Sequence, residues 1–328
     1  MNSPVDSANA TRASSIIREA PGAWRDLVNR QSFAFQHSLV GHPLFDLPRL
    51  AKLGGDMLKN HGEEKLLLQV AESVPNVRKQ WANFTPVQKI DSAIANIQSS
   101  GSWVMIKDAQ FDPAYKALLD EIILDLERVS GMPLRQEITW GEVGVFIGSP
   151  NSVTHYHIDS ETNFLFQIHG HKQAHLYDQS DRSVISDEEI EQFFYGELNA
   201  ATLRPDAKSK MVDFKPGTGI HIPVSAPHWV KNLDDYSVSL SILLYLRSMD
   251  ARAHVYQVNH MLRKMGLKPT PPGVSPTKDR AKALALELVS VAQPATKRQV
   301  IHSGLDRVKG VAGRLKGTSG RVTQQKGM

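Results

Sequence analysis

The chain contains no cysteine among its 328 residues. Disulfide bonds, thiolate zinc sites, iron–sulfur clusters and cysteine nucleophiles are therefore excluded, and any bound metal must be held by His, Asp or Glu side chains. No apolar run approaches the roughly 20 residues that a membrane-spanning helix requires. The N-terminus also lacks the basic and apolar segments of a secretory signal. These absences predict a cytoplasmic protein with no membrane span.

Positive and negative charges are also nearly balanced in the sequence. The formal net charge is +4 at pH 7, with 41% hydrophobic and 22% charged residues, as is typical of an ordinary globular protein. Most of the positive excess lies in the final segment, residues 293–328, which contains many Lys and Arg residues and a single acidic residue, Asp306. A Gly-rich basic end of this kind is favoured to be disordered, although it leaves nucleic-acid binding open.

The first segment, residues 1–135, reads as mainly helical. Apolar residues recur at helical spacing in residues 47–58, 87–98 and from Pro113 to about Gly131. Residues 103–106 form the one short apolar run in this region that is typical of a strand. We expect this region to pack on the domain that follows it.

Residues 136–248 have a different sequence pattern, with short apolar or alternating runs separated by Gly, Pro, Asn and Asp. Many short strands at such spacing favour a sandwich or barrel. The runs are residues 144–147, 163–168, 173–177, 219–223 and 237–246, with one predicted helix at 187–194. Helical periodicity returns in residues 249–292. The chain is therefore predicted to be α+β, with a β core between N-terminal and C-terminal helical additions.

The most informative motif is a histidine and a carboxylate two residues apart, His157 and Asp159, in a run typical of a strand. Side chains two apart on a strand project to the same face, so this pair can converge on one point. A third candidate ligand, His228, follows the turn that contains Pro223 and Pro227. Two histidines and one carboxylate on one side of a metal are typical of non-haem Fe(II) oxygenases. An isolated His-x-Asp often arises by chance, and the later histidine makes the metal interpretation stronger.

These motifs resemble those of the Jumonji-C and cupin-like 2-oxoglutarate dioxygenases, in particular the asparaginyl-hydroxylase branch. The resemblance covers roughly the central third of the chain and implies a double-stranded β-helix, the jelly-roll or cupin core. It is carried by Thr154, His157, Asp159, residues 163–172, Pro223 and His228. A second cupin signature fits Gly217, Pro223, His228 and Asn232, with Ser225 where glycine is usual.

The resemblance also implies a role for each matching residue. His157, Asp159 and His228 would hold Fe(II), and Lys172 would pair with the distal carboxylate of 2-oxoglutarate. A buried dicarboxylate needs such a compensating charge. Thr154 would hydrogen-bond that carboxylate, and Asn163 would also contact the co-substrate. The implied reaction consumes O2 and 2-oxoglutarate, releases succinate and CO2, and hydroxylates a substrate.

Several alternatives remain open from the sequence. Jumonji-C demethylases usually carry Glu where this chain has Asp159, which favours hydroxylation without excluding demethylation. The substrate is unidentified, with a protein or peptide side chain slightly favoured over a small metabolite. A non-catalytic cupin-like regulator or ligand-binding protein is the alternative function. The C-terminal helices predict a homodimer, because related enzymes often dimerise through such a pair.

Some further residues have more than one interpretation. Trp140, Phe146 and Tyr177 could line the pocket, although ordinary core positions are favoured for aromatic residues in strands. His221 lies in an alternating run between Ile220 and Ile222. It could point toward the substrate, although other positions are favoured.

Overall fold

The computed structural model describes residues 15–70, 90–197 and 201–290. The chain divides into two compact units. The first unit comprises residues 1–186 and 200–247, and the second comprises residues 187–199 and 248–328. The basic segment from residue 293 onward, and the first part of the helix expected at 87–98, lie outside the described residues.

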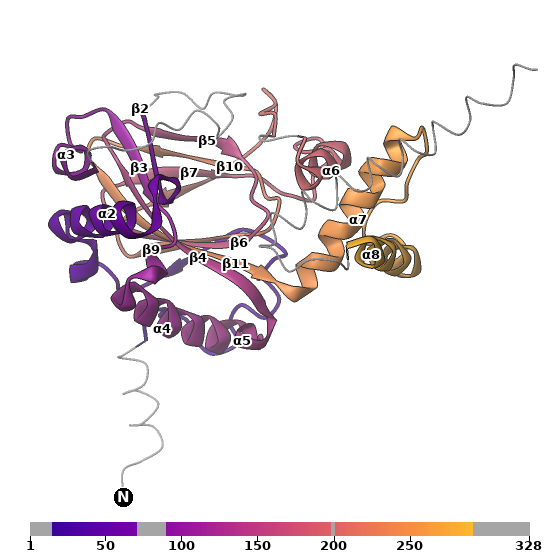
Figure 1. The fold of residues 1–328 in the computed structure, drawn as a ribbon, viewed down its shortest axis with the longest axis horizontal. Helices are drawn as coiled ribbons and strands as arrows, with labels where there is room; N and C mark the ends of the chain where they lie inside the picture. Colours follow the sequence, from indigo (N-terminus) through magenta and orange to yellow (C-terminus); the bar gives the residue numbers. More distant parts are fainter. Residues whose placement is uncertain (1–14, 71–89, 198–200, 291–328) are drawn as a thin grey trace, which may run out of the picture. The chain divides into compact units, whose positions relative to one another are not determined.

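Two antiparallel sheets form the first unit (Figure 1). The larger sheet has seven strands in the order β1-β9-β6-β11-β4-β3-β2, and the smaller has four in the order β5-β10-β7-β8. The seven are β1 (Phe33–Gln36), β9 (Thr218–Ile222), β6 (Thr162–His169), β11 (Ser237–Leu246), β4 (Ile138–Gly148), β3 (Ser102–Ile106) and β2 (Leu66–Val70). The four are β5 (Val153–His157), β10 (His228–Asn232), β7 (Lys172–Leu176) and β8 (Lys210–Phe214).

The eight consecutive strands β4 to β11 define the fold. Strands β4, β6, β9 and β11 lie side by side in the larger sheet, and β5, β7, β8 and β10 form the smaller one. The chain thus passes repeatedly from one sheet to the other, which is the arrangement of a double-stranded β-helix or jelly roll. The fold class predicted from the sequence is confirmed.

Alternation along the strands places a hydrophobic core between the two sheets. Each strand presents every second side chain to this interior. The core cluster comprises Leu165, Ala174, Leu176, Val212, Phe214, Ile220, Ile222, Ala226 and Val230. All of them are at most 9% exposed, and Phe146 packs against the cluster.

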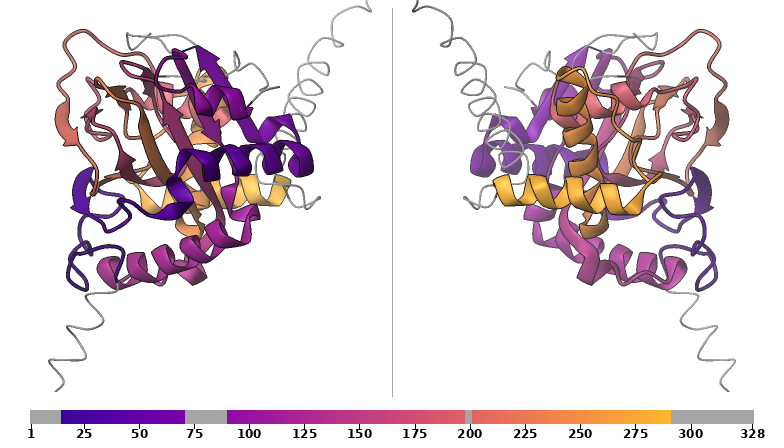
Figure 2. Two further views of the ribbon diagram at one scale, coloured as in Figure 1. Left: turned by 90° about the vertical axis from the view of Figure 1, so that its left-hand side faces the viewer. Right: turned by 90° about the vertical axis from the view of Figure 1, so that its right-hand side faces the viewer.

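The N-terminal region contributes strands as well as helices. Strand β1 pairs with β9, and β2 and β3 extend the sheet beyond β4. Only β3 was predicted from the sequence, so the mainly helical description of residues 1–135 requires this correction. The helical pieces are η1 (Pro43–Phe45), α2 (Leu47–His61), η2 (Glu63–Lys65), α3 (Ile90–Ala95), η4 (Ala109–Phe111), α4 (Pro113–Ser130) and α5 (Leu134–Glu137). Figure 2 shows the same helices around the sheets from two further sides.

Helix α4 shows why these sequences form these elements. Pro113 occupies its first turn, where a missing N–H costs nothing, and the Asp112 carboxylate accepts a hydrogen bond from the Ala114 N–H at 2.9 Å. Gly131 ends the helix in the left-handed conformation at φ 68°. The expected helix from Pro113 to Gly131 is confirmed.

The second unit is helical, with α6 (Asp187–Tyr195), α7 (Arg247–Lys264, of which Arg247 belongs to the first unit) and α8 (Pro276–Ser290). Arg263 binds the buried Glu191 at 2.6 Å, and the Gln257 amide donates to the Phe194 carbonyl at 3.0 Å. These contacts connect α6 to α7. Within the described residues, no helix has the length and hydropathy that crossing a bilayer demands.

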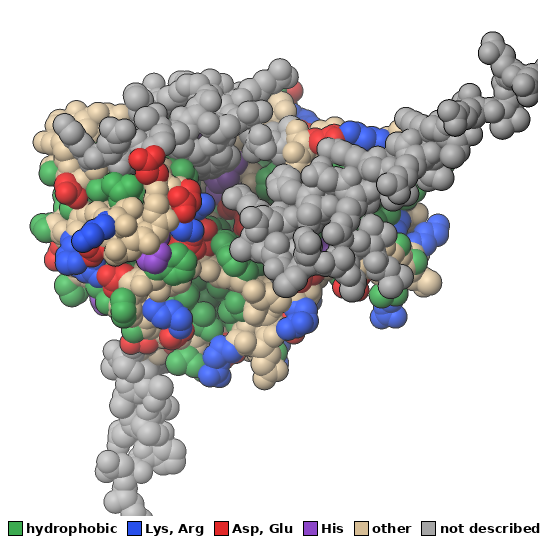
Figure 3. Space-filling model, viewed as in Figure 1, with side chains coloured by type: hydrophobic (Ala, Val, Ile, Leu, Met, Phe, Trp, Pro, Cys, Tyr) green, Lys and Arg blue, Asp and Glu red, His purple; other side chains and the backbone are tan. Residues whose placement is uncertain are grey.

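Basic and acidic side chains are interspersed on the face shown in Figure 3. Among the coloured residues of that face they do not gather by sign. The described part of the chain therefore adds nothing on this side to the nucleic-acid interpretation, which rests on residues 293–328 alone.

Candidate metal centre

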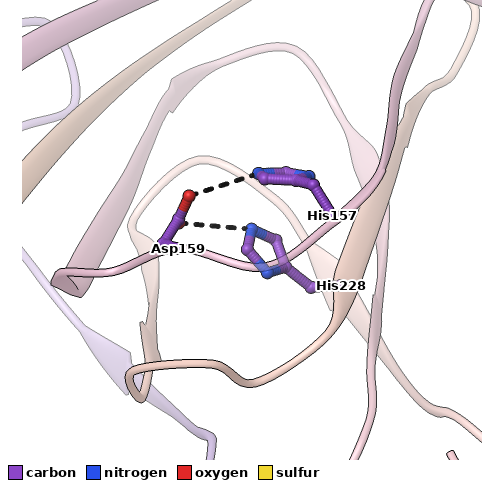
Figure 4. A group of neighbouring side chains, drawn as sticks. All are labelled: His157, Asp159 and His228. Atoms are coloured by element: carbon purple, nitrogen blue, oxygen red, sulfur yellow. Dashed lines mark ion pairs between the residues drawn. The ribbon is translucent and has the colours of Figure 1, made fainter. Parts of the chain in front are cut away.

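Three side chains from separate parts of the first unit converge at one end of the strands (Figure 4). His157 is the last residue of β5, and His228 is the first residue of β10 directly opposite it in the register. Asp159 follows β5 by two residues. Its carboxylate oxygens lie 3.7 Å from His157 Nε2 and 3.8 Å from His228 Nε2. One ligand atom from each residue lies within 4.8 Å of the others, which suits a single bound ion.

Backbone carbonyls orient both imidazoles. His157 Nδ1 lies 2.6 Å from the His155 carbonyl, and His228 Nδ1 lies 3.0 Å from the Ala226 carbonyl. A carbonyl can only accept, so each Nδ1 carries the proton and each Nε2 presents a lone pair. Both lone pairs belong to the nitrogens nearest Asp159.

The protonation states suit a cation. Burial lowers the pKa of His157 to about 4, and it lowers the pKa of His228 to about 4 as well. Both rings are therefore neutral at pH 7, as metal ligands must be. Burial raises the pKa of Asp159, while His228 and a hydrogen bond from Asn163 oppose that rise. A divalent cation would supply the positive charge that this carboxylate lacks.

Asp159 reaches the site through a turn rather than through the strand. Strand β5 ends at His157, so the same-face argument holds only for the general direction of Asp159. The Ser225 N–H donates to the Asp159 carbonyl at 2.9 Å and fixes this loop to the turn before β10. Ser225 has a φ of 60°, a left-handed conformation that glycine adopts without steric cost. This conformation explains why the signature usually has glycine here.

Lys172 is a buried cation without a counter-charge. It begins β7 on the same face as Ala174 and Leu176, which belong to the core between the sheets. Its side chain is buried, and burial lowers its pKa to about 7. Within the described residues its ammonium forms no hydrogen bond or ion pair. A buried lysine rarely lacks a counter-charge, and a bound anion would supply one.

A β-bulge places Thr154 on the inner face. His228 pairs with His157 and Val230 pairs with Thr154, so two residues of β10 match three of β5. The extra residue allows Thr154 and His157, three positions apart, to share a face with Val230. The Trp103 indole N–H donates to the Thr154 hydroxyl oxygen at 3.2 Å. No sequence motif indicated Trp103, because its nearness depends on this register.

Asn163 lies beside the candidate ligands. It is 6% exposed, and its side-chain oxygen accepts a hydrogen bond from the Ser241 hydroxyl at 2.9 Å. It also hydrogen-bonds the Asp159 carboxylate. Ser241 was not singled out in the sequence. It belongs to a stripe of small residues on the inner face of β4 and β11, formed by Gly144, Gly148, Ser237, Ser239 and Ser241.

The remaining candidates lie elsewhere. His221 is fully buried, but its Nε2 accepts from the Asn29 N–H at 3.0 Å and its ring packs on Phe33 and Phe164. Its neighbours Ile220 and Ile222 occupy the inner core, so His221 points to the opposite face and not toward a substrate.

The three aromatic candidates have different positions. Phe146 is part of the core packing, and Tyr177 accepts a hydrogen bond from the Trp229 indole at 3.2 Å. Trp140 is 38% exposed near the start of β4. Phe146 and Tyr177 therefore hold the structural positions that the sequence favoured.

Comparison with known proteins gives distant similarities. No protein-family model matches the chain. The mouse and rat proteins named HSPB1-associated protein 1 are each 26% identical to it over 153 residues. That match covers 40% of this chain but only 30% and 31% of those proteins, so the chain spans under a third of the curated relatives it matches.

Among solved structures, Escherichia coli YcfD is similar at 12% identity and a TM-score of 0.46 over 85% of this chain and 69% of that chain. A complex of YcfD, described as a ribosomal oxygenase, with cobalt and 2-oxoglutarate gives 12% identity and a TM-score of 0.43 over 85% and 68%. The fold assignment itself rests on the strand order of this chain.

Proposed function

We propose that the protein is an Fe(II)- and 2-oxoglutarate-dependent dioxygenase that hydroxylates a substrate. One observation carries the proposal: a His–Asp–His triad with both imidazole lone pairs directed inward lies in the same β-helix as a buried, uncompensated lysine. The donor set fits Fe(II), and the lysine fits a dicarboxylic co-substrate. A protein that only bound a neutral ligand would need neither feature.

The residues have separate tasks in this proposal. His157, Asp159 and His228 would hold the iron, and Lys172 and Thr154 would anchor the distal carboxylate of 2-oxoglutarate. Asn163, which already contacts Asp159, would orient the Asp159 carboxylate and also contact the co-substrate. Bound Fe(II) supplies the activation of O2 that couples decarboxylation of 2-oxoglutarate to oxidation of the substrate. His157 and His228 are 7% and 4% exposed, so the fold limits the access of bulk water to both imidazoles.

The proposed product and substrate class come from the sequence motifs. Asp159, in place of the Glu usual in demethylases, supports hydroxylation over demethylation. A protein or peptide side chain is the favoured substrate on the motif resemblance alone. The non-catalytic regulator remains the alternative, and it does not require an inward-facing triad.

Succinate formation from 2-oxoglutarate in the presence of Fe(II) and ascorbate tests the proposal. We expect slow uncoupled turnover without substrate, because all the residues that we assign to the metal and the co-substrate belong to this chain. The half-exposed His169, which pairs with Asp235 at 3.2 Å, provides a control. Replacing His169 by Ala should leave turnover unchanged, whereas no succinate from the wild-type protein would favour the regulator.

Binding of 2-oxoglutarate should weaken as the pH rises above 7. The cross-strand neighbours of Lys172, Asn232 and Phe214, carry no charge, and burial lowers the lysine pKa to about 7. A bound carboxylate favours the ammonium form and raises that pKa, so binding takes up a proton above pH 7. Affinity should be constant below pH 7 and fall by up to about tenfold per pH unit above it.

Calorimetric dissociation constants of the zinc-loaded protein between pH 6 and pH 9 measure this effect. The slope should disappear in a Lys172→Ala variant. A slope that persists in that variant would assign the proton uptake to another group.

We also propose that the C-terminal helices mediate a homodimer. Met265 beyond α7 is 74% exposed and Leu284 on α8 is 57% exposed, so both present apolar surface. Light scattering at micromolar concentration tests this proposal, and a monomeric mass would contradict it.

A further inference from the structure

Trp103 lies outside the motifs that carry the proposed function, but its side chain reaches the same inner face. It belongs to β3, which the N-terminal region adds to the larger sheet beside β4. It is 3% exposed, and its ring packs on Phe146 with centroids 5.4 Å apart. Its register partner on β4 is Gly148, and Met105, two residues later on β3, pairs with Phe146. The hydrogen bond to Thr154 therefore crosses from the larger sheet to the smaller one.

The chemistry of this hydrogen bond fixes the role of the hydroxyl. An indole N–H can only donate, whereas a threonine hydroxyl can accept and donate at once. Because Trp103 donates to the Thr154 oxygen, the hydroxyl hydrogen is directed away from the indole. Across residues 15–70, 90–197 and 201–290, this hydrogen has no acceptor. Thr154 is only half-buried, so the hydrogen is available to a ligand.

Thr154 and Lys172 share the inner face of the smaller sheet. Thr154 pairs with Val230, Val230 pairs with Ala174, and Lys172 lies two residues from Ala174 on the same side of β7. Two strand spacings and two residues of rise separate their Cα atoms by about 12 Å. Side chains on one face of a sheet project into the same space, so the long, flexible lysine side chain can bring its ammonium to an anion that the hydroxyl contacts.

We propose that Trp103 is a positioning residue for the co-substrate. Its indole holds the Thr154 hydroxyl as a hydrogen-bond donor toward the distal carboxylate of 2-oxoglutarate, opposite Lys172. The inference rests on the proposed function, since it assigns a device to that same site. It makes β3, a strand outside the β-helix, part of the co-substrate site.

Replacing Trp103 by Phe tests the hydrogen bond while keeping an aromatic ring against Phe146. Without the indole, the hydroxyl is free to rotate and donates less effectively. We expect the dissociation constant for 2-oxoglutarate, measured by calorimetry on the zinc-loaded protein, to rise about three- to tenfold. The KM for 2-oxoglutarate should rise by the same factor with kcat unchanged, and zinc affinity should not change.

Double substitution separates this role from packing. In a Thr154→Val background the hydroxyl is absent, so Trp103→Phe should change 2-oxoglutarate affinity by less than about twofold. In a Thr154→Ser background the hydroxyl is restored, and the three- to tenfold effect should return. An equal loss of affinity in the Val and Ser backgrounds, or no loss in either, would overturn the proposal.

If the Trp103→Phe protein does not fold, an NMR measurement tests the proposal instead. The indole N–H resonance of Trp103 should shift on adding 2-oxoglutarate in the wild-type and Thr154→Ser proteins, and should not shift in Thr154→Val. A shift of the same size in all three would overturn the role of Trp103 and leave the dioxygenase proposal standing. A wild-type protein that neither binds 2-oxoglutarate nor forms succinate would remove the proposed function, and this inference with it.

Discussion

Replacing Asp159 by Ala is expected to abolish metal binding and 2-oxoglutarate turnover together. Asp159 supplies the only carboxylate of the triad, and its oxygens lie 3.7 and 3.8 Å from the two imidazole nitrogens. Loss of groups that merely support metal ligands costs about 10- to 100-fold in affinity or activity, so loss of a ligand should exceed 100-fold. Equilibrium dialysis with Zn(II) and succinate formation measure the two effects.

The folded protein should tolerate this change. The ligand-free Asp159 carboxylate is partly buried and its pKa is raised by desolvation, so its removal takes away an unfavourable, partly desolvated charge. The melting temperature without metal should be unchanged or higher. Asp235→Ala, at an exposed site that pairs with His169, is the matched control and should retain metal and turnover. Retention of both functions by Asp159→Ala would contradict the assignment of this residue.

Replacing Lys172 by Ala should separate metal binding from 2-oxoglutarate binding. The metal site should remain intact, while the KM for 2-oxoglutarate rises by about 30-fold or more. Truncating one partner of a buried charge pair costs roughly 2–5 kcal/mol, which corresponds to that factor or a larger one. Zinc dialysis and succinate kinetics at varied 2-oxoglutarate concentration distinguish this result from the loss expected for Asp159→Ala.

Lys172 should also destabilise the ligand-free protein. Its folded pKa, about 7, lies below the ordinary value of 10.5, so between these values the unfolded chain binds more protons and stability rises with pH. Replacing Lys172 by Met should therefore stabilise the ligand-free protein at pH 7 by about 1–3 kcal/mol. Lys231→Ala is the control, because Lys231 alternates with Val230 and lies on the outer face of β10. Equal changes in the KM for both lysine variants would show that the effect does not arise from the co-substrate site.

The sequence was informative where chemistry is local. The triad was predicted from its motif, and Lys172 and Asn163 from the family resemblance. The structure brings all of them to the inner face or mouth of one β-helix. Hydrophobic runs also predicted β4, β6, β7, β9 and β11, because long or strongly apolar strands have a clear pattern. How these strands form two sheets came from the resemblance and not from the runs themselves.

Features that depend on register could not be predicted. Strand β8 reads Lys-Met-Val-Asp-Phe in a polar stretch, and β10 begins directly after Pro227, so neither has a distinctive run. The bulge that turns Thr154 inward is set by pairing between β5 and β10. The contact between Trp103 and Thr154 joins residues 51 positions apart and depends on that pairing, on the pairing of β3 with β4 and on the facing of the two sheets. Asp159 converges with His157 through a turn fixed by Ser225, which strand alternation does not describe.

A cobalt titration under anaerobic conditions tests the central claim most directly, because the visible absorption of Co(II) reports its ligands. We predict one Co(II) per chain, a spectrum lost in the His157→Ala and Asp159→Ala variants, and a change of that spectrum when 2-oxoglutarate is added. The Lys172→Ala variant should bind Co(II) normally but need a much higher concentration of 2-oxoglutarate for the same change. Cobalt binding that survives both triad substitutions, or a wild-type spectrum unaffected by 2-oxoglutarate, would contradict the proposal.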